Sequence, residues 1–167
     1  MPAPFRIEPL SATHDRSQFQ SGSEPLDRYL REQASQDIRR RIATCFVAIG
    51  DTGEIAGYYT LAAVSIALNH LSADIARKLP RYPVVPAALL GRLAVARDRH
   101  GQGLGAALLA DAILRVSRTE LGVFAIVVDA KDRAATRFYQ HHGFTALTGV
   151  ARRLFLPIAT ALRARPK

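Results

Sequence analysis

The sequence has 167 residues, 49% of them hydrophobic, and a formal net charge of +9 at pH 7. This length suits a single domain with one core, and the composition excludes disordered, collagen-like and disulfide-scaffold chains. No stretch approaches the roughly 20 consecutive apolar residues that a membrane-spanning helix needs, so we expect no membrane association.

The first part of the chain predicts a strand, a helix and a hairpin. Ser23 is a residue type that caps helices, and apolar residues then recur at helical spacing up to position 38. In chain order we expect a strand at 6–9, a polar loop at 15–22, a helix from 23 to the arginines at 39–41, and hairpin strands at 43–49 and 55–68.

The rest of the chain alternates predicted helices and strands. Three prolines between positions 79 and 86 predict an extended loop. We expect a short helix within 69–78, strands at 88–95 and 123–128, helices at 104–119 and 132–141, final strands at 144–150 and 152–156, and a basic tail of undefined structure at 157–167. This order predicts an α/β (α+β) fold with a mixed sheet.

The single cysteine and the first residues bear on where the protein works. Cys45 has no second cysteine for an internal disulfide, and residues 1–10 lack the apolar core of a secretion signal. We therefore expect a cytoplasmic protein in a reducing environment. Cys45 lies in an apolar run and is interpreted as a packed strand residue, with a catalytic nucleophile as the alternative.

A glycine-rich turn at 101–105 is the strongest local motif, because it joins a predicted buried strand to a helix. Glycine permits positive φ and a close approach of the backbone to a ligand. The free N–H groups of the helix's first turn, together with the helix dipole, suit a pyrophosphate. The turn lacks the Gly-Lys-Ser/Thr of a P-loop and the acidic partner of a dinucleotide-binding fold. A purely structural turn is the remaining alternative.

The run at 93–109, followed by the segment at 129–144, resembles the GCN5-related N-acetyltransferase (GNAT) superfamily. The resemblance implies one domain spanning 1–167, with a twisted, mostly antiparallel sheet of six or seven strands and about four helices. It implies acetyl-CoA as co-substrate, no metal, and Tyr139 as the catalytic acid. The implied acetyl-CoA-binding residues are Leu93, Ala94, Val95, His100, Gly101, Gln102, Gly103, Leu104, Gly105, Ala106, Asp132, Ala135 and Phe138.

Two positions depart from the family pattern. His100 stands where the turn usually begins with Gln or Arg, and Asp132 stands where the later helix often begins with Asn. A neutral His100 can still donate to a phosphate, and Asp132 can cap the helix. The backbone cradle is therefore retained, while the side-chain contacts to CoA differ.

Within the superfamily, the segments 19–22, 26–30, 57–61, 83–86 and 90–95 resemble the acetyltransferase toxins of type II toxin–antitoxin systems. Those enzymes acetylate the α-amino group of aminoacyl-tRNA and block translation. The resemblance implies a ribbon-helix-helix antitoxin as partner, contact with operator DNA only through the antitoxin complex, repression of the pair's own operon, and a homodimer.

The basic residues allow two interpretations, a polyanion-binding surface or a charged face without a partner. With the resemblance, the first is favoured, and the expected tRNA-binding residues are Arg39, Arg40, Arg41, Arg77, Lys78, Arg81 and Arg92. Four further arginines are assigned to antitoxin docking or to solubility: Arg152, Arg153, Arg163 and Arg165.

Amide formation from a thioester needs a neutral amine, a polarised carbonyl and a protonated leaving thiolate. Backbone N–H near Val95 could polarise the carbonyl, and a phenol of pKa about 10 can protonate a thiolate whose thiol has a pKa of about 8.5. Tyr139 could instead merely pack against the sheet. An α-amine of pKa about 8 is partly neutral near pH 7 and needs little help from a base. The candidate bases, each more simply a solvated residue, are Glu54, His70, His141 and His142.

Three functions remain open at this level. The first is a toxin that acetylates aminoacyl-tRNA, and the second is an acetyltransferase for a small amine or a protein N-terminus. The third is a non-catalytic nucleic-acid-binding module whose glycine turn is only structural. Binding of acetyl-CoA separates the third function from the first two.

Overall fold

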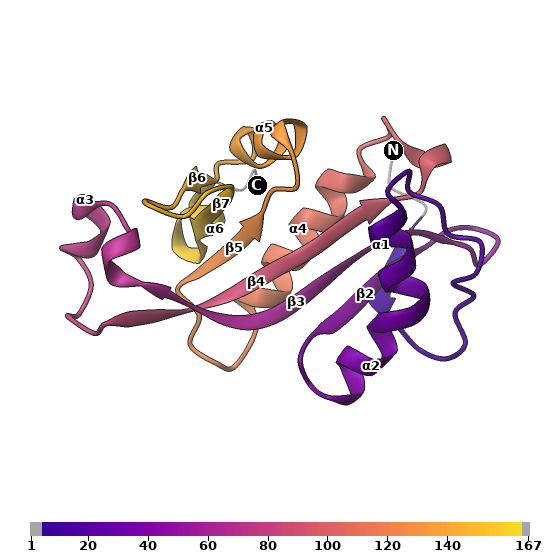
Figure 1. The fold of residues 1–167 in the computed structure, drawn as a ribbon, viewed down its shortest axis with the longest axis horizontal. Helices are drawn as coiled ribbons and strands as arrows, with labels where there is room; N and C mark the ends of the chain where they lie inside the picture. The colour runs from indigo at the N-terminus through magenta and orange to yellow at the C-terminus, as the bar shows by residue number, and fades with distance from the viewer. Residues whose placement is uncertain (1–4, 165–167) are drawn as a thin grey trace. The chain divides into compact units, whose positions relative to one another are not determined.

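A computed structural model describes residues 5–164 of the chain (Figure 1). Seven strands form one sheet in the order β1-β2-β3-β4-β5-β7-β6. The strands are β1 (Arg6–Pro9), β2 (Thr44–Ile49), β3 (Ile55–Ala67), β4 (Val84–Val95), β5 (Ala125–Asp129), β6 (Thr145–Ala146) and β7 (Arg153–Pro157). Pairing is antiparallel for β1–β2, β2–β3, β5–β7 and β6–β7, and parallel for β4–β5. This confirms the predicted mixed, mostly antiparallel sheet.

The helices alternate with these strands along the chain. They are α1 (Glu24–Arg28), α2 (Ala34–Arg39), α3 (Ala73–Ala76), α4 (Leu104–Ser117), α5 (Arg133–His141) and α6 (Ile158–Ala164). A π-helical segment η1 (Tyr29–Gln33) joins α1 to α2, and two short 3-10 helices are η2 (Leu68–His70) and η3 (Arg97–Arg99). Within residues 5–164, no helix has the length and apolar character needed to span a membrane.

The chain divides into two compact units, each with its own core. The first contains Met1–Ala62 and Gly91–Ala112, and the second contains Ala63–Leu90 and Ile113–Lys167. Strands β3 and β4 and helix α4 each begin in one unit and end in the other.

In the first unit, the helical segment from α1 to α2 packs against β2 and the start of β3 (Figure 1). Alternate residues of β2 face this core, because successive side chains of a strand point to opposite faces. The buried core residues are Phe19, Tyr29, Leu30, Ala34, Cys45, Val47, Ile49, Ile55, Tyr58, Ala94 and Ala96.

The predicted helix after Ser23 is present but differs in two details. Ser23 occupies the N-cap position, yet its side chain accepts no hydrogen bond from the helix. Buried Asp27 instead fixes the preceding loop by accepting hydrogen bonds from Ser21 N (3.0 Å) and Ser21 Oγ (2.6 Å). The helix also widens, because Ala34 N donates to Tyr29 O five residues back. Such π segments often mark functional sites, and the hydrophobic spacing did not predict this one.

Helix α4 packs closely against the sheet of the first unit at Gly57. A Cβ atom at Gly57 would lie 2.9 Å from the carbonyl oxygen of Ala94 and 2.9 Å from Leu108 Cδ1. Any larger residue would push apart β3, β4 and the helix that follows the glycine turn. Gly57 therefore helps to position that turn.

In the second unit, Ile75 and Ala76 of α3 and Leu79 of the loop after it pack against a core to which β4, β5 and β7 contribute. Its buried core residues are Ile66, Leu71, Val85, Ala87, Ala125, Val127, Leu147 and Phe155. Strand β4 begins at Val84, so the predicted loop at 79–86 is too long. The strand tolerates Pro86 because this residue is exposed and only its carbonyl is used, accepting a 2.9 Å hydrogen bond from Phe124 N.

Several boundaries in the second unit also differ from the prediction. The helix expected within 69–78 is divided into η2 and α3, and the strand expected at 144–150 is only the two-residue β6. The strand expected at 123–128 is displaced to β5, and the tail forms α6. Residues 1–4 and 165–167, with the predicted docking residue Arg165, lie outside the described residues.

Candidate active site

The glycine turn between η3 and α4 has the backbone that its sequence predicts. Gly101 has φ 79° and Gly103 has φ 81°, values that favour glycine, and no atom lies within 4 Å of where a Cβ would stand on either residue. Ala107 N donates to Gly103 O (3.1 Å), so Gly103 is the last residue before the helix and has no side chain to cap it. The amide groups of residues 104–106 thus have no acceptor within the helix.

His100 links this turn to the end of β4. Its Nε2 lies 2.9 Å from the carbonyl oxygen of Val95 and must donate, because a carbonyl only accepts. A neutral His100 therefore offers a ligand an acceptor, Nδ1, and no donor. For a phosphate to accept a hydrogen bond from this ring, as expected from the sequence, it would have to displace the carbonyl oxygen of Val95.

The β4 residues before the turn are firmly held in the first unit. Ala94 is buried in the core, while Leu93 and Val95 are partly exposed on either side of it. Ala96 N donates to Ala56 O (2.8 Å), and Arg97 N donates to Gln20 O (2.7 Å). The strand end that leads into the turn therefore has a fixed backbone.

Glu54, a candidate base, is held as a carboxylate in the same unit. Thr52 donates to Glu54 Oε1 from its hydroxyl (2.8 Å) and its amide (3.1 Å), and Arg99 forms an ion pair with Oε2. The hydrogen bond from the Thr52 hydroxyl is the largest of the effects that lower the pKa of Glu54. A carboxylate with a lowered pKa is a poor general base near pH 7.

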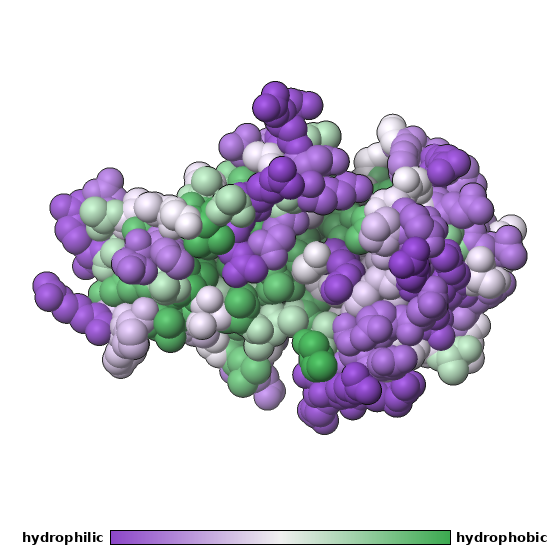
Figure 2. Space-filling model, in the orientation of Figure 1, coloured by the Kyte–Doolittle hydropathy of each residue, from purple (hydrophilic) through white to green (hydrophobic). Residues whose placement is uncertain are grey.

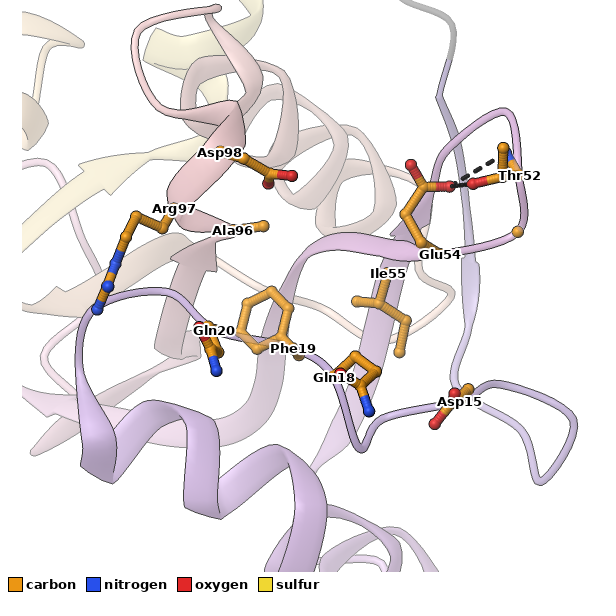
Figure 3. A pocket seen from close by; sticks show the side chains of 11 residues that line it. Asp15, Gln18, Phe19, Gln20, Thr52, Glu54, Ile55, Ala96, Arg97 and Asp98 are labelled. Carbon is orange, nitrogen blue, oxygen red and sulfur yellow. Dashed lines mark hydrogen bonds between the residues drawn. The ribbon is translucent and has the colours of Figure 1, made fainter.

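A cavity of about 610 Å³ lies beside Glu54 (Figure 3). Phe19 and Ile55 form its apolar wall, and acidic Asp15, Glu54 and Asp98 lie around it (Figure 3). Apart from Glu54, none of the predicted site residues lines it. Sequence reasoning missed this cavity because its walls come from segments near positions 15–20, 52–55 and 96–98, which are far apart along the chain.

Tyr139 lies on α5 in the second unit. The helix begins as predicted, with Asp132 as N-cap accepting a 2.8 Å hydrogen bond from Ala135 N. The Tyr139 ring is 7% exposed and packs against Phe138 and Phe144, with ring centroids 5.2 and 5.5 Å away. Two aromatic neighbours therefore fix the orientation of the ring.

The hydroxyl of Tyr139, unlike its buried ring, is exposed to solvent. It makes no hydrogen bond to any residue among 5–164, and no fully buried side-chain oxygen or nitrogen in that range lacks a partner. The hydroxyl oxygen must therefore reach the surface. Burial of the ring, with a smaller effect of Asp129, raises the pKa of Tyr139 to about 12. Tyr139 consequently keeps its proton at neutral pH and presents it to the outside.

Of the histidines considered as bases, His142 shares the surroundings of Tyr139. Its ring lies 4.8 Å from that of Phe138, and burial, followed by the proximity of His141, lowers its pKa. His142 is therefore neutral near pH 7 and can accept a proton. His70 lies in η2, where its carbonyl accepts from Thr148 N (2.9 Å). No group of three or more His, Cys, Asp or Glu within the described part of the chain could hold a metal ion.

Cys45 lies in the core of the first unit with 3% exposure. Burial raises the pKa of its thiol to about 12, so almost no thiolate exists at neutral pH. Both facts favour the packed strand residue over the nucleophile.

Residues 41–146, more than half of the chain, match the family model described as an acetyltransferase (GNAT) domain. The chain belongs to the GNAT acetyltransferase family. This GNAT enzyme is similar to the tRNA-acetylating toxin of Mycobacterium tuberculosis, with 40% identity over 144 residues, which cover 85% of this chain and 83% of the relative. It is 27% identical to the probable toxin TacT of Sinorhizobium fredii over 165 residues, 92% of this chain and 91% of the relative.

Solved structures of toxins resemble the whole chain. AtaT complexed with acetyl-methionyl-tRNAfMet has a TM-score of 0.88 and 29% identity, covering 95% of this chain and 98% of AtaT. A tyrosine-to-phenylalanine variant of KacT has a TM-score of 0.89 and 27% identity, and the match covers 98% of this chain and 100% of KacT. AtaTR bound with AcCoA has a TM-score of 0.83 and 29% identity, and the match covers 96% of this chain and 97% of the AtaTR chain. The expected GNAT fold is thereby confirmed.

The basic residues of this GNAT enzyme that were predicted to bind tRNA differ in their surroundings. Arg39, Arg40 and Arg41 are exposed at the end of α2 in the first unit, and Arg77, Lys78 and Arg81 are exposed around the end of α3 in the second. Arg77 forms an ion pair with Asp74. Arg92 is only partly exposed, and its guanidinium carbon lies 3.6 Å from the centroid of the Tyr29 ring.

The arginines considered for antitoxin docking or solubility are largely engaged within the second unit of this GNAT enzyme. Arg153 holds Asp129 with two hydrogen bonds of 2.7 and 2.9 Å. Arg152 donates to Lys131 O (3.3 Å), and Arg163 donates to Thr160 Oγ1 (3.3 Å). Arg153 thus has a structural role beside Tyr139, because it pairs with the carboxylate that influences the tyrosine.

Proposed function

We propose that this protein transfers the acetyl group of acetyl-CoA to the α-amino group of aminoacyl-tRNA and acts as a toxin that blocks translation. The observation that carries the proposal is its 40% identity, over most of both chains, to a tRNA-acetylating toxin. The similarity to AtaT complexed with acetyl-methionyl-tRNAfMet supports the same acceptor.

We assign the acetyl-CoA site to the end of β4, Leu93–Val95, and to residues 100–106. The positive φ of Gly101 and Gly103, the open space beside them and the uncapped start of α4 fit a diphosphate bound by backbone amides. Acetyl-CoA supplies the activated acyl group. Of the other expected contacts, Asp132 and Ala135 are joined to each other by the helix cap, and Phe138 packs on Tyr139.

We assign Tyr139 as the catalytic acid. Its hydroxyl holds a proton at neutral pH because burial of the ring raises its pKa to about 12. The oxygen reaches the surface while the ring is fixed, which suits delivery of that proton to a leaving thiolate. The acceptor α-amine, of pKa about 8, needs little help to lose its proton, and our candidate base is neutral His142, which follows the helix that carries Tyr139.

We further propose that residues 1–167 work as one catalytic domain in the cytoplasm, where tRNA is found, with an antitoxin as partner. Solved relatives include AtaT bound to the C-terminus of the antitoxin AtaR, the AtaT–AtaR complex bound to DNA, and a KacTA–DNA complex. By analogy, we expect the antitoxin complex, rather than this chain alone, to bind operator DNA.

The test is to incubate the protein with radiolabelled acetyl-CoA and either aminoacylated tRNA, free amino acids or short peptides. We expect label in the RNA fraction that mild alkali releases as N-acetyl-amino acid, with deacylated tRNA as the unlabelled control. Label found only on free amines or peptides would establish the second candidate function and overturn this one.

A further inference from the structure

The loop between α3 and β4 presents an exposed aromatic ring. Tyr82 is 65% exposed, whereas the four other tyrosines of the chain are at most 7% exposed. Within residues 5–164, Tyr82 makes no hydrogen bond, ring contact or cation–π contact. Single apolar residues are common on protein surfaces, but tyrosine is enriched at interfaces, and an exposed ring forgoes the stabilisation of burial while offering a stacking face.

The backbone on both sides of Tyr82 is anchored. Leu79 packs against the core of the second unit, and Val85 is part of that core. The carbonyl of Pro83 accepts a 3.0 Å hydrogen bond from Leu68 N. A following proline also restricts Tyr82 to an extended backbone. The backbone that carries the ring is therefore fixed just before β4, so little backbone freedom is lost when a ligand binds.

The charges beside the ring select the kind of partner. The side chains of Lys78 and Arg81 are exposed and form no ion pair or hydrogen bond with any residue of the described chain, while that of Arg77 is paired with Asp74. Figure 2 shows hydrophilic side chains projecting in the region where α3 and this loop lie in Figure 1. An apolar protein surface would bury these two cations without a partner, at a cost. A nucleic-acid strand offers phosphates to the cations and bases to the ring.

We propose that residues 78–82, the Tyr82 loop, bind the unpaired nucleotides at the 3′ end of tRNA. One base stacks on the Tyr82 ring, and Lys78 and Arg81 contact the adjoining phosphates. Aromatic stacking recognises single-stranded RNA ends, where bases are not already paired. The choice of tRNA as the RNA rests on the proposed function.

The test compares the dissociation constants of intact deacylated tRNA and of the same tRNA trimmed of its unpaired 3′ nucleotides, measured by fluorescence anisotropy on the full chain. We expect wild type to bind intact tRNA about 5- to 100-fold more tightly. Tyr82→Leu should abolish this difference, and Tyr82→Phe should keep it, because the ring rather than the hydroxyl stacks. Arg81→Gln should reduce the slope of log affinity against log salt by about 0.7, and Arg118→Gln, at the exposed end of α4, should change it less.

The outcomes separate this proposal from the proposed function. A Tyr82→Leu variant that still prefers intact tRNA overturns the role of the loop, whether or not wild type acetylates aminoacyl-tRNA. The same result together with a changed sedimentation coefficient would show that Tyr82 serves a protein contact. Loss of the preference in Tyr82→Leu, in a protein that acetylates only small amines, would sustain the loop's role and refute the proposed acceptor.

Discussion

The guanidinium carbon of Arg92 lies 3.6 Å from the centre of the Tyr29 ring, and the Tyr29 hydroxyl donates a 2.8 Å hydrogen bond to buried Asp37. Gln33 donates to the other oxygen of Asp37 (3.1 Å). These contacts connect the π-helical segment to Arg92 of β4. Arg92 immediately precedes Leu93–Val95, the end of the strand assigned to acetyl-CoA. Arg92 thus holds the helical segment against the strand. The sequence had predicted only that Arg92 contacts a tRNA phosphate, and did not predict this structural role.

This network predicts measurable coupling between Arg92 and Tyr29. Tyr29→Phe keeps the ring but leaves Asp37 without one of its donors, so we expect a loss of about 1–3 kcal/mol in the free energy of unfolding. In a double-mutant cycle with Arg92→Ala and Tyr29→Leu, the coupling energy should be about 0.5–2 kcal/mol, measured by urea denaturation. Arg92→Lys should lose part of this coupling, because an ammonium cannot stack as a planar group. Strict additivity of the two substitutions would contradict the arrangement.

Removal of the Tyr139 hydroxyl should slow acetyl transfer without weakening the donor complex. For Tyr139→Phe we expect kcat to fall about 10²- to 10⁴-fold, because the leaving thiolate loses its proton donor. Acetyl-CoA affinity, measured by calorimetry, should stay near the wild-type value, since the phenylalanine ring fills the same site.

The pH dependence of transfer offers an independent check on Tyr139. Because its pKa is raised to about 12, the rate should show no loss from phenol ionisation below about pH 10. The rate should instead rise as the α-amine loses its proton near pH 8. An unchanged kcat in Tyr139→Phe would remove this residue from the role of acid.

The glycine turn can be tested with a matched pair of substitutions. Gly101→Ala and Gly149→Ala both place a Cβ on a residue of positive φ with no atom within 4 Å, so each should cost about 1–2 kcal/mol of stability. Only Gly101→Ala should weaken acetyl-CoA binding, because only this turn directs backbone amides at the proposed diphosphate site. Equal acetyl-CoA affinities for the two variants in calorimetry would argue against that site.

Cys45 should make the protein less stable as the pH rises. Its thiol pKa is raised from 9.0 to about 12 by burial, so the folded chain keeps a proton that the unfolded chain releases. Its contribution to stability is fully present below pH 9 and declines between pH 9 and about 12, at up to about 1.4 kcal/mol per pH unit. Cys45→Ala should be less stable at pH 7 because of the small cavity it leaves.

The diagnostic measurement for Cys45 is the slope of unfolding free energy against pH, from about pH 8 to about pH 9, where tyrosines of pKa about 10 have barely begun to titrate. Wild type should show the steeper decline, and Cys45→Ala a flatter one. Parallel slopes would mean that the thiol ionises equally in both states. Native Cys45 should also resist alkylation at pH 8 until the protein is unfolded, since only the thiolate reacts.

Some features of the fold were predictable because neighbouring residues decide them. The apolar runs at 43–49 and 55–68, with a turn between them, predicted β2 and β3, and the Asp132 cap and the positive φ of Gly101 and Gly103 followed from local backbone rules. The start of β4 was predicted wrongly. Proline is disfavoured in strands because it lacks a backbone N–H, but at Pro86 the strand needs only the carbonyl as an acceptor. The π segment was not predicted. The spacing of hydrophobic residues in a continuous α-helix is nearly the same as in a helix with one extra residue in a single turn.

The sequence by itself determined the family, the glycine turn and the identity of the catalytic candidate Tyr139, because these depend on residues that are close together in the chain. Only the tertiary structure decided which side chains are buried and what surrounds them. It placed Arg92 on Tyr29, raised the pKa of Tyr139 through burial of its ring, and left Tyr82 exposed in the same loop as Lys78 and Arg81, whose side chains have no partner within residues 5–164. The physical reason is that desolvation and packing depend on the whole fold, whereas turns and caps depend on a few consecutive residues.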